Sequence, residues 1–363
     1  EEDIHEWNMN NIYHNITERS KAKQRFFAWL YNPNSNDSET EKHYTREQIL
    51  NKHYNGEIVS TPFGRTIQSD NFHALNYLLQ SSSSDNCIQS AGGSTMVVIG
   101  IGTAGCKVAY SFGKGHKKVF IGPDKFPKTC KTVEDYENKC PSLKKELTFS
   151  AKECWIFVCG ASKTSGATLR ILEKIKNKKL NVVYMTPDNL LSTPTQTKQD
   201  KVAFNILQQF ARSGLINAVY LVSNAALVEI VGEGPISDVY RSANSTLANI
   251  IETFEYFKES EPVLGTIAET KEVSRIRTFS IGLLEEDEEK LLFPLDNITE
   301  SGYMYSINED ELHQESGLLM SIKDRVAQDK EKNLFSSFVI FSSPHERSFF
   351  YSIKSTHFIQ EKI

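Results

Sequence analysis

The chain has 363 residues, of which 39% are hydrophobic and 24% are charged, and its formal net charge at pH 7 is −5. This length suits two or three domains, and the composition is typical of a soluble globular protein rather than of a disordered or fibrous one. The negative net charge argues against a positive electrostatic potential over the whole chain that would attract nucleic acid, although it is compatible with a local basic patch. No apolar run reaches the 18 or more residues of a membrane span.

The six cysteines predict reduced thiols in a cytoplasmic protein, and no metal centre is expected. They form no CxxC pair and no cluster with histidine at a metal-ligand spacing, and Cys154 and Cys159 lie in an apolar run. The chain shows no secretion signal and begins with Glu1 rather than methionine, so we expect its natural N-terminus to lie further upstream.

Residues 1–90 are polar and predict a mostly helical segment. Within it, Arg19, Lys23, Phe27 and Tyr31 recur at every fourth position, which traces a slowly drifting stripe on a helix. Two cations one turn apart, followed by aromatic rings, suit a triphosphate with a base stacked above it. The alternative is a basic amphipathic helix whose aromatic stripe packs in a core.

Small residues at 81–84 (SSSS) and 91–94 (AGGS) predict a linker, after which apolar β-branched runs alternate with helical patterns. We expect strands at 97–101, 118–121, 155–159, 182–185 and 218–223, and helices at 167–176, 201–213 and 244–257. This alternation predicts an α/β fold with a doubly wound parallel sheet. Later strands at 277–284, 303–307, 337–341 and 349–353 predict a smaller C-terminal α/β domain. The expected domains are therefore 1–90, 94–258 and 259–363.

Two glycine-rich turns follow strands of the predicted parallel sheet. The first is GIGTAG at 100–105, and the second is CGASKTSGAT at 159–168. Glycines let the backbone approach a phosphate, and the helix that follows supplies free N–H groups and a positive dipole end. The second turn lacks the GK[ST] of a Walker A loop. A Rossmann site for another nucleotide remains an alternative for the first turn, although no acidic residue ends a second strand where NAD ribose binding needs one.

Four further stretches follow in order: GPD at 122–124, VVYMTPD at 182–188, LVSNAALVEIVG at 221–232 and YRSAN at 240–244. With the two turns, they resemble the tubulin/FtsZ superfamily, and LQQFARSGLINAVYLVSN at 207–224 is similar to its divergent bacteriophage members. The resemblance implies a GTP- or GDP-binding protein, with Mg²⁺ as a further candidate cofactor, that assembles head to tail into filaments. Its implied GTP-binding residues are Gly100, Gly102, Thr103, Gly105, Asp124, Gly160, Ser162, Thr164, Ser165, Gly166 and Asn244.

The sequence departs from that family in the elements that support hydrolysis. In the family, a loop after the central helix carries an acidic residue that completes the active site of the next subunit. Its usual GLINxDxxD motif is absent here, and Glu269 and Glu272 are the acidic candidates in the corresponding stretch, 263–272. A carboxylate there could orient the attacking water. We therefore expect GTP binding with slow or absent hydrolysis, and we leave enzyme status open.

Residues 10–90 resemble part of a phage-type family A DNA polymerase. RSKAKQRFFAWLYNP at 19–33 is similar to motif B of the fingers helix, and TPFGR at 61–65 and HALNYLLQS at 73–81 follow it. The resemblance implies that Arg19, Lys23, Phe27 and Tyr31 bind a dNTP and that Asn76 and Gln80 contact DNA. The two metal-binding carboxylates that polymerisation needs are missing. A polymerase fragment or fusion that is not catalytic by itself is thus the alternative function, and a non-hydrolysing phage structural protein is a third.

Overall fold

A computed structural model describes residues 12–13, 22, 25–26, 37–45, 56–61, 64–69, 95–188, 191–232, 236–268, 270–284, 289–314, 317–343 and 348–361. The chain forms two compact units, Glu1–Ser81 and Ser82–Ile363. Within these ranges, no helix is long and apolar enough to cross a membrane.

The first unit contains an element that its helical pattern did not predict. Strands β1 (Gly56–Thr61) and β2 (Gly64–Ser69) form an antiparallel hairpin in which Thr61 pairs with Gly64. β-Branched residues at Ile58, Val59 and Ile67 favour strands and outweigh the polar composition of the segment. A short helix, α3 (Ser38–Glu41), precedes the hairpin and is capped by the side chain of Asp37.

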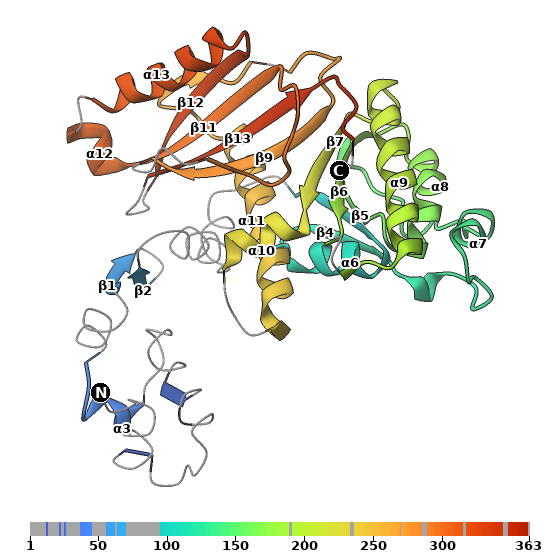
Figure 1. Cartoon of the computed structure of the whole chain (residues 1–363), viewed down its shortest axis with the longest axis horizontal. Helices are drawn as coiled ribbons and strands as arrows, with labels where there is room; N and C mark the ends of the chain where they lie inside the picture. Colours follow the sequence, from blue (N-terminus) through green and yellow to red (C-terminus); the bar gives the residue numbers. More distant parts are fainter. Residues whose placement is uncertain are drawn as a thin grey trace. The chain divides into compact units, whose positions relative to one another are not determined.

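The second unit is built on one eleven-stranded sheet with the order β4-β3-β5-β6-β7-β9-β13-β11-β12-β8, to which β10 adds beside β9 (Figure 1). Its first half is parallel and comprises β3 (Val97–Ile101), β4 (Lys117–Ile121), β5 (Glu153–Cys159), β6 (Lys179–Thr186) and β7 (Ala218–Ser223). β3, β5, β6 and β7 are buried almost throughout, as expected for strands covered on both faces. The predicted fold class is confirmed.

Helices cover both faces of the parallel half, as Figure 1 shows. On one face, α8 (Thr168–Lys174) and α9 (Pro194–Arg212) pack Leu172 and Phe204 into the same core as Ile99 and Ile156. On the other face lie α6 (Gly102–Ser111), α10 (Asn224–Val231) and α11 (Ile236–Glu259). There the rings of Trp155 and Phe254 meet edge to face.

The second half of the sheet continues from the first without a break. β9 (Ile276–Leu283) runs parallel to β7, and β10 (Glu289–Leu291), β13 (Phe349–Thr356), β11 (Glu300–Asn308), β12 (Phe335–Ser343) and β8 (Leu264–Thr266) follow. Two helices, α12 (Glu309–Gln314) and α13 (Leu318–Glu331), connect β11 to the parallel β12. α13 buries Ile322 and Val326 against Tyr303 and Tyr305.

Two helices begin earlier than their apolar periodicity predicted. α9 begins at Pro194, where Thr193 and Gln196 form a capping box. α11 begins at Ile236, directly after Pro235, so Asn244 lies two turns inside the helix rather than at its start. A capping box and a proline at or before the first turn are start signals that the sequence carries, but the polar first turns hid them from a periodicity argument.

Candidate functional site

The three glycines of the first turn have different structural tasks. A Cβ on Gly100 would lie 2.4 Å from the carbonyl oxygen of Gly105, and a Cβ on Gly105 would lie 2.2 Å from that of Phe157. These two glycines therefore let α6 pack directly on β3 and β5. Gly102 has φ +74° and faces the side chain of Ser162, at 3.0 Å from its Oγ to the ideal Cβ position. Gly102 is thus the point where the two predicted loops meet.

The second loop is packed so tightly that Gly160 has no room for a side chain. Its Cβ would lie 1.7 Å from the Tyr184 hydroxyl oxygen and 2.6 Å from Oδ1 of Asp200. The Tyr184 hydroxyl donates to Asp200 Oδ1 at 2.5 Å, and burial raises the pKa of Tyr184. Ser165 donates to the carbonyl oxygen of Gly160 at 3.2 Å, which closes the loop on itself.

Not every predicted loop hydroxyl is turned toward open space. Thr164 and Ser165 are buried, and Ser162 is half-buried and donates to Thr164 Oγ1 at 3.3 Å. Gly166 makes room for helix α7 (Val133–Asn138), because a Cβ there would lie 2.1 Å from the Val133 carbonyl oxygen. In this structure the loop therefore offers Ser162 and backbone groups to a ligand rather than its full set of hydroxyls.

Two helix N-termini begin at these loops, and neither carries a capping side chain. α6 starts at Gly102, and a 3₁₀ helix, η3 (Lys163–Ala167), follows Ser162 and leads into α8. Neither first turn contains an acidic residue. Uncapped N–H groups and the positive dipole end attract an anion. Because both starts follow parallel strands, they lie at the carboxyl-terminal edge of the sheet, where open α/β sheets bind ligands.

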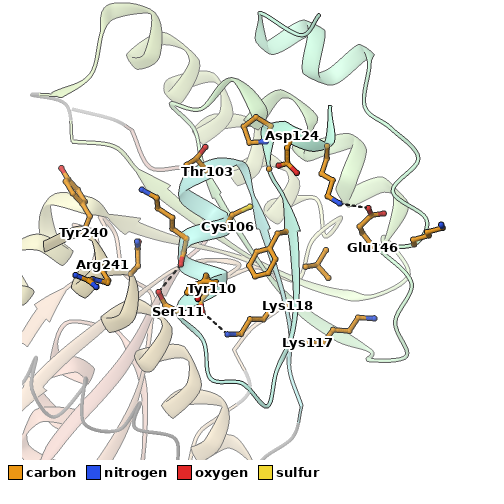
Figure 2. A pocket seen from close by; sticks show the side chains of 18 residues that line it. Thr103, Cys106, Tyr110, Ser111, Lys117, Lys118, Asp124, Glu146, Tyr240 and Arg241 are labelled. Carbon is orange, nitrogen blue, oxygen red and sulfur yellow. Dashed lines mark hydrogen bonds and ion pairs between the residues drawn. The ribbon is translucent and has the colours of Figure 1, made fainter. Parts of the chain in front are cut away.

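A cavity of about 960 Å³ extends from the first of these N-termini along α6 (Figure 2). Thr103, next to Gly102, lines it together with Asp124 and Asn244. Asp124 is exposed on the 3₁₀ turn η2 (Pro123–Lys125) after β4, and Asn244 is half-buried on α11. The structure therefore brings together three predicted binding residues from three separate segments. The predicted residues 160–166 do not line this cavity and adjoin it through the Gly102–Ser162 contact.

The cavity is cationic although the chain as a whole is acidic. Its lining includes two carboxylates, Asp124 and Glu146, and six basic side chains. The basic residues are Lys107, Lys117, Lys118, Lys125, Lys145 and Arg241. Lys125 pairs with Glu146 at 3.3 Å, and Lys117 donates to the carbonyl oxygen of Thr148. An excess of positive charge around a concave site of this size suits a ligand with several negative charges.

Several lining residues were not singled out from the sequence. Cys106, Lys107 and Tyr110 follow Thr103 at helical spacing on α6, and Tyr240 precedes Asn244 by one turn of α11. The i, i+3/i+4 and i+7 spacing was the available signal, since it places these side chains on the faces that carry Thr103 and Asn244. Burial raises the pKa of the Cys106 thiol, so it lines the cavity as a neutral group.

No protein-family model and no curated protein matches this chain. Solved structures do. FtsZ of M. jannaschii, an empty dimer, is similar with a TM-score of 0.54 and 14% identity over 78% of this chain and 91% of that one. A GTPγS-form protofilament of TubZ from Bacillus thuringiensis serovar israelensis is similar with a TM-score of 0.58 and 11% identity over 78% and 93% of the two chains. CetZ2 of Haloferax volcanii, a GTPγS-bound protofilament, is similar with a TM-score of 0.53 and 13% identity over 72% of this chain and 92% of that one.

The chain has the tubulin/FtsZ-like fold. At these identities the likeness concerns the fold, and it covers nearly the full length of each of those three proteins.

In this tubulin/FtsZ-like fold, Glu272, one of the two predicted catalytic acids, lies far from the loops. Glu272 is exposed in the segment that leads into β9, and β9 runs parallel to β7 with Ile276 beside Val219. That segment is therefore at the amino-terminal edge of the parallel strands, opposite Gly102 and Ser162. Strands of five to eight residues separate the two edges by about 20 Å. Glu269 lies outside the described residues.

The residues assigned to DNA or dNTP binding are not described by the structure. Arg19, Lys23, Phe27, Tyr31, Asn76 and Gln80 all fall outside the described ranges. In the described part of the chain, no cluster of three or more His, Cys, Asp or Glu residues could hold a metal ion. Asp124 and Glu146 are the carboxylates that line the cavity.

Proposed function

We propose that this chain binds guanine nucleotides at the carboxyl-terminal edge of its sheet and assembles head to tail with copies of itself. The observation that carries the proposal is the meeting of two uncapped helix N-termini at Gly102 and Ser162, beside a cationic cavity. The phosphates would lie on these N-termini, and the rest of the nucleotide would extend along α6 toward α11. The solved neighbours support this, since two of them are GTPγS-bound or GTPγS-form protofilaments.

Asn244 is the proposed reader of the base. Its amide carries both a carbonyl acceptor and N–H donors, which can complement the donor and acceptor edge of guanine. Tyr240 lies one turn earlier on α11, is 43% exposed and lines the same cavity, so its ring is available to stack on a base. Both residues lie on α11, which packs against α6.

Self-association follows from the separation of the two halves of the site. In one molecule, Glu272 and the phosphate loops lie at opposite edges of the sheet, so one copy cannot bring them together. A second copy stacked edge to edge can, and repeating that heterologous contact makes a filament. Exposed apolar side chains are present at both edges: Leu191 follows β6, and Val273 and Phe335 lie at the other edge.

We further propose that hydrolysis is slow or absent, because the stretch 263–272 lacks the family's motif and has Glu269 and Glu272 as its acidic side chains. A phage origin and a place in the host cytoplasm remain part of the proposal on the strength of residues 207–224 and the cysteine usage.

The deciding experiment is calorimetric titration of the full chain with GTP, GDP and ATP, followed by light scattering with each nucleotide. We expect GTP and GDP to bind more tightly than ATP and GTP to promote assembly. Asn244→Ala should reduce the preference for guanine, whereas the neighbouring Ser245→Ala should leave it unchanged. Absence of guanine-nucleotide binding would refute the proposal.

A further inference from the structure

The buried carboxylate of Glu300 anchors the segment that leads into β9 by hydrogen bonds. Glu300, the first residue of β11, is 5% exposed. Its Oε2 accepts the backbone N–H of Lys271 at 3.0 Å, and its Oε1 accepts the Ser274 hydroxyl at 2.6 Å. Hydrogen bonds to an ionised carboxylate are among the strongest that a protein makes. One side chain thus fixes two points of this segment, which we call the acidic loop (residues 267–275).

A second anchor comes from the neighbouring strand. Ser337 on β12 accepts the backbone N–H of Ala268 at 3.1 Å. Glu300 and Ser337 lie on paired parallel strands, β11 and β12, near their amino-terminal ends. The two anchors therefore hold the acidic loop at Ala268 and at Lys271 and Ser274.

A small cavity of about 30 Å³ lies between the acidic loop and the sheet. Its lining is mixed: Thr270, Glu300, Ser301 and Ser337 contribute polar groups, and Ile267, Phe335 and Ile353 contribute apolar ones. The Ser301 hydroxyl is buried and has no hydrogen-bond partner among the described residues. A cavity of this size, with the unpartnered Ser301 hydroxyl in its lining, accommodates one water molecule. Burying the Glu300 carboxylate here costs free energy that its two hydrogen bonds to the loop offset.

Three consecutive side chains of the acidic loop, at 271–273, are exposed to solvent. Glu272 and Lys271 are exposed, and Val273 is 61% exposed. One acid is therefore buried to hold the loop while another is presented on its surface.

We propose that Glu300 is a positioning residue, with Ser337 as its partner anchor, and that it fixes the acidic loop for contact with the nucleotide of the next copy. The inference rests on the proposed function for its consequence, but the anchoring itself can be tested without nucleotide.

The first test is hydrogen–deuterium exchange of the full-length chain. Glu300→Ala should accelerate exchange of the 267–275 amides about tenfold or more, since both charge-assisted bonds are lost. Glu300→Gln should give a smaller acceleration, because its carbonyl oxygen can still accept from Lys271 and its N–H can donate to Ser274. Ser301→Ala is the matched control, since this hydroxyl shares the cavity but bonds to nothing in the loop. Unchanged exchange in Glu300→Ala would overturn the inference.

The second test is GTP turnover at concentrations that support assembly. Glu300→Gln should lower the maximal rate about tenfold while leaving the GTP dissociation constant of the unassembled chain unchanged. In a Glu269→Gln/Glu272→Gln background, Glu300→Gln should have no further effect on turnover, because it acts through the loop. A purely structural role would instead lower turnover equally in both backgrounds. If wild-type chain binds GTP and turns it over but Glu300→Gln matches it, the coupling is wrong. If wild-type chain binds GTP and assembles but does not turn it over, the coupling of Glu300 to turnover is refuted as well. If wild-type chain neither binds GTP nor assembles, the proposed function fails. In both cases exchange alone decides the anchoring.

Discussion

At the residue scale, the absence of a side chain at Gly160 allows the second glycine loop, residues 159–168, to pack as it does. The Tyr184 hydroxyl and the Asp200 carboxylate occupy the space that a Cβ would need. Neither of these buried groups can leave without breaking the hydrogen bond between them. The glycine is required by packing at this point, and the loop conformation that faces Gly102 follows from it.

We predict that Gly160→Ala destabilises the chain by about 1–3 kcal/mol, the usual cost of overpacking, and sharply weakens GTP binding. Gly115→Ala is the control, because a Cβ there meets nothing within 4 Å. Urea unfolding and calorimetry measure the two effects. Wild-type stability and affinity in Gly160→Ala would show that the loop is looser than this packing implies.

A second residue-scale prediction concerns Glu255 on α11. Burial raises the pKa of Glu255 above its usual 4.5, although Lys258 lies 3.0 Å away. A raised carboxyl pKa means that the folded chain binds more protons than the unfolded chain just above pH 4.5, so this group's contribution to stability falls as pH rises through that window. At pH 7 its ionised form is therefore a net cost.

We expect Glu255→Gln to be more stable than wild type at pH 7, with the difference vanishing as pH approaches 4. Urea unfolding across this range measures it, and the exposed Glu261→Gln should show no such trend. A Glu255→Gln variant less stable than wild type at pH 7 would mean that the Lys258 pair outweighs the burial.

At the element scale, a buried charge network joins four elements of the C-terminal half. Lys354 on β13 lies 3.1 Å from Glu289 on β10 and donates to the Tyr303 hydroxyl of β11 at 2.6 Å. Tyr303 in turn donates to Asp329 of α13 at 2.8 Å. Burial lowers the pKa of Lys354, and the negative charges of Glu289 and Asp329 oppose that shift. The network fixes α13 and β10 relative to the sheet.

Lys354→Met should cost about 3–5 kcal/mol, because it leaves the half-buried Glu289 and the buried Asp329 without their cation. Adding Glu289→Gln to that variant should recover part of the loss, since one uncompensated charge is removed. The exposed Lys332→Met should change stability by less than about 0.5 kcal/mol. Urea unfolding measures these stability changes. Near-wild-type stability of Lys354→Met would contradict the argument.

At the scale of the whole molecule, the sheet separates the two glycine loops, proposed to bind the nucleotide, from Glu272 of the acidic loop by its full strand length. Chemistry that needs both must therefore be shared between copies. GTP turnover is then expected to rise with protein concentration more steeply than in proportion, and monomeric protein should be inactive.

Complementation between two defective variants tests this. Gly102→Val should block the nucleotide site, and Glu269→Ala/Glu272→Ala should lower turnover by about 10²–10⁴ while leaving GTP affinity nearly intact. Each variant should be inactive alone, whereas an equal mixture should recover turnover, because an intact loop then meets a bound nucleotide. A mixture that stays inactive while wild type is active would argue against the shared site. Brisk turnover by monomeric wild type would do the same.

Much of the fold could be predicted from the sequence because it depends on residue patterns within short segments. Buried parallel strands are continuous apolar runs, and a glycine-rich turn between a strand and a helix is recognisable from its residues. β3 and the loops after β3 and β5 were therefore predicted at their observed positions. The starts of α9 and α11 were missed because their first turns are polar and periodicity begins only where a helix becomes buried. The β1–β2 hairpin was missed because pairing between two strands, and not either segment alone, stabilises it.

The sequence by itself determined the α/β class and the two glycine loops, since these depend on residues within a few positions of one another. Tertiary structure alone decided that Gly102 meets Ser162 and that Thr103, Asp124 and Asn244 share one cationic cavity. It also decided that Gly160 and Gly166 serve packing, and that Glu300 lies beneath the acidic loop. Each of these facts is a contact between segments far apart in the chain, and such contacts arise only when strand order brings those segments to one edge of the sheet.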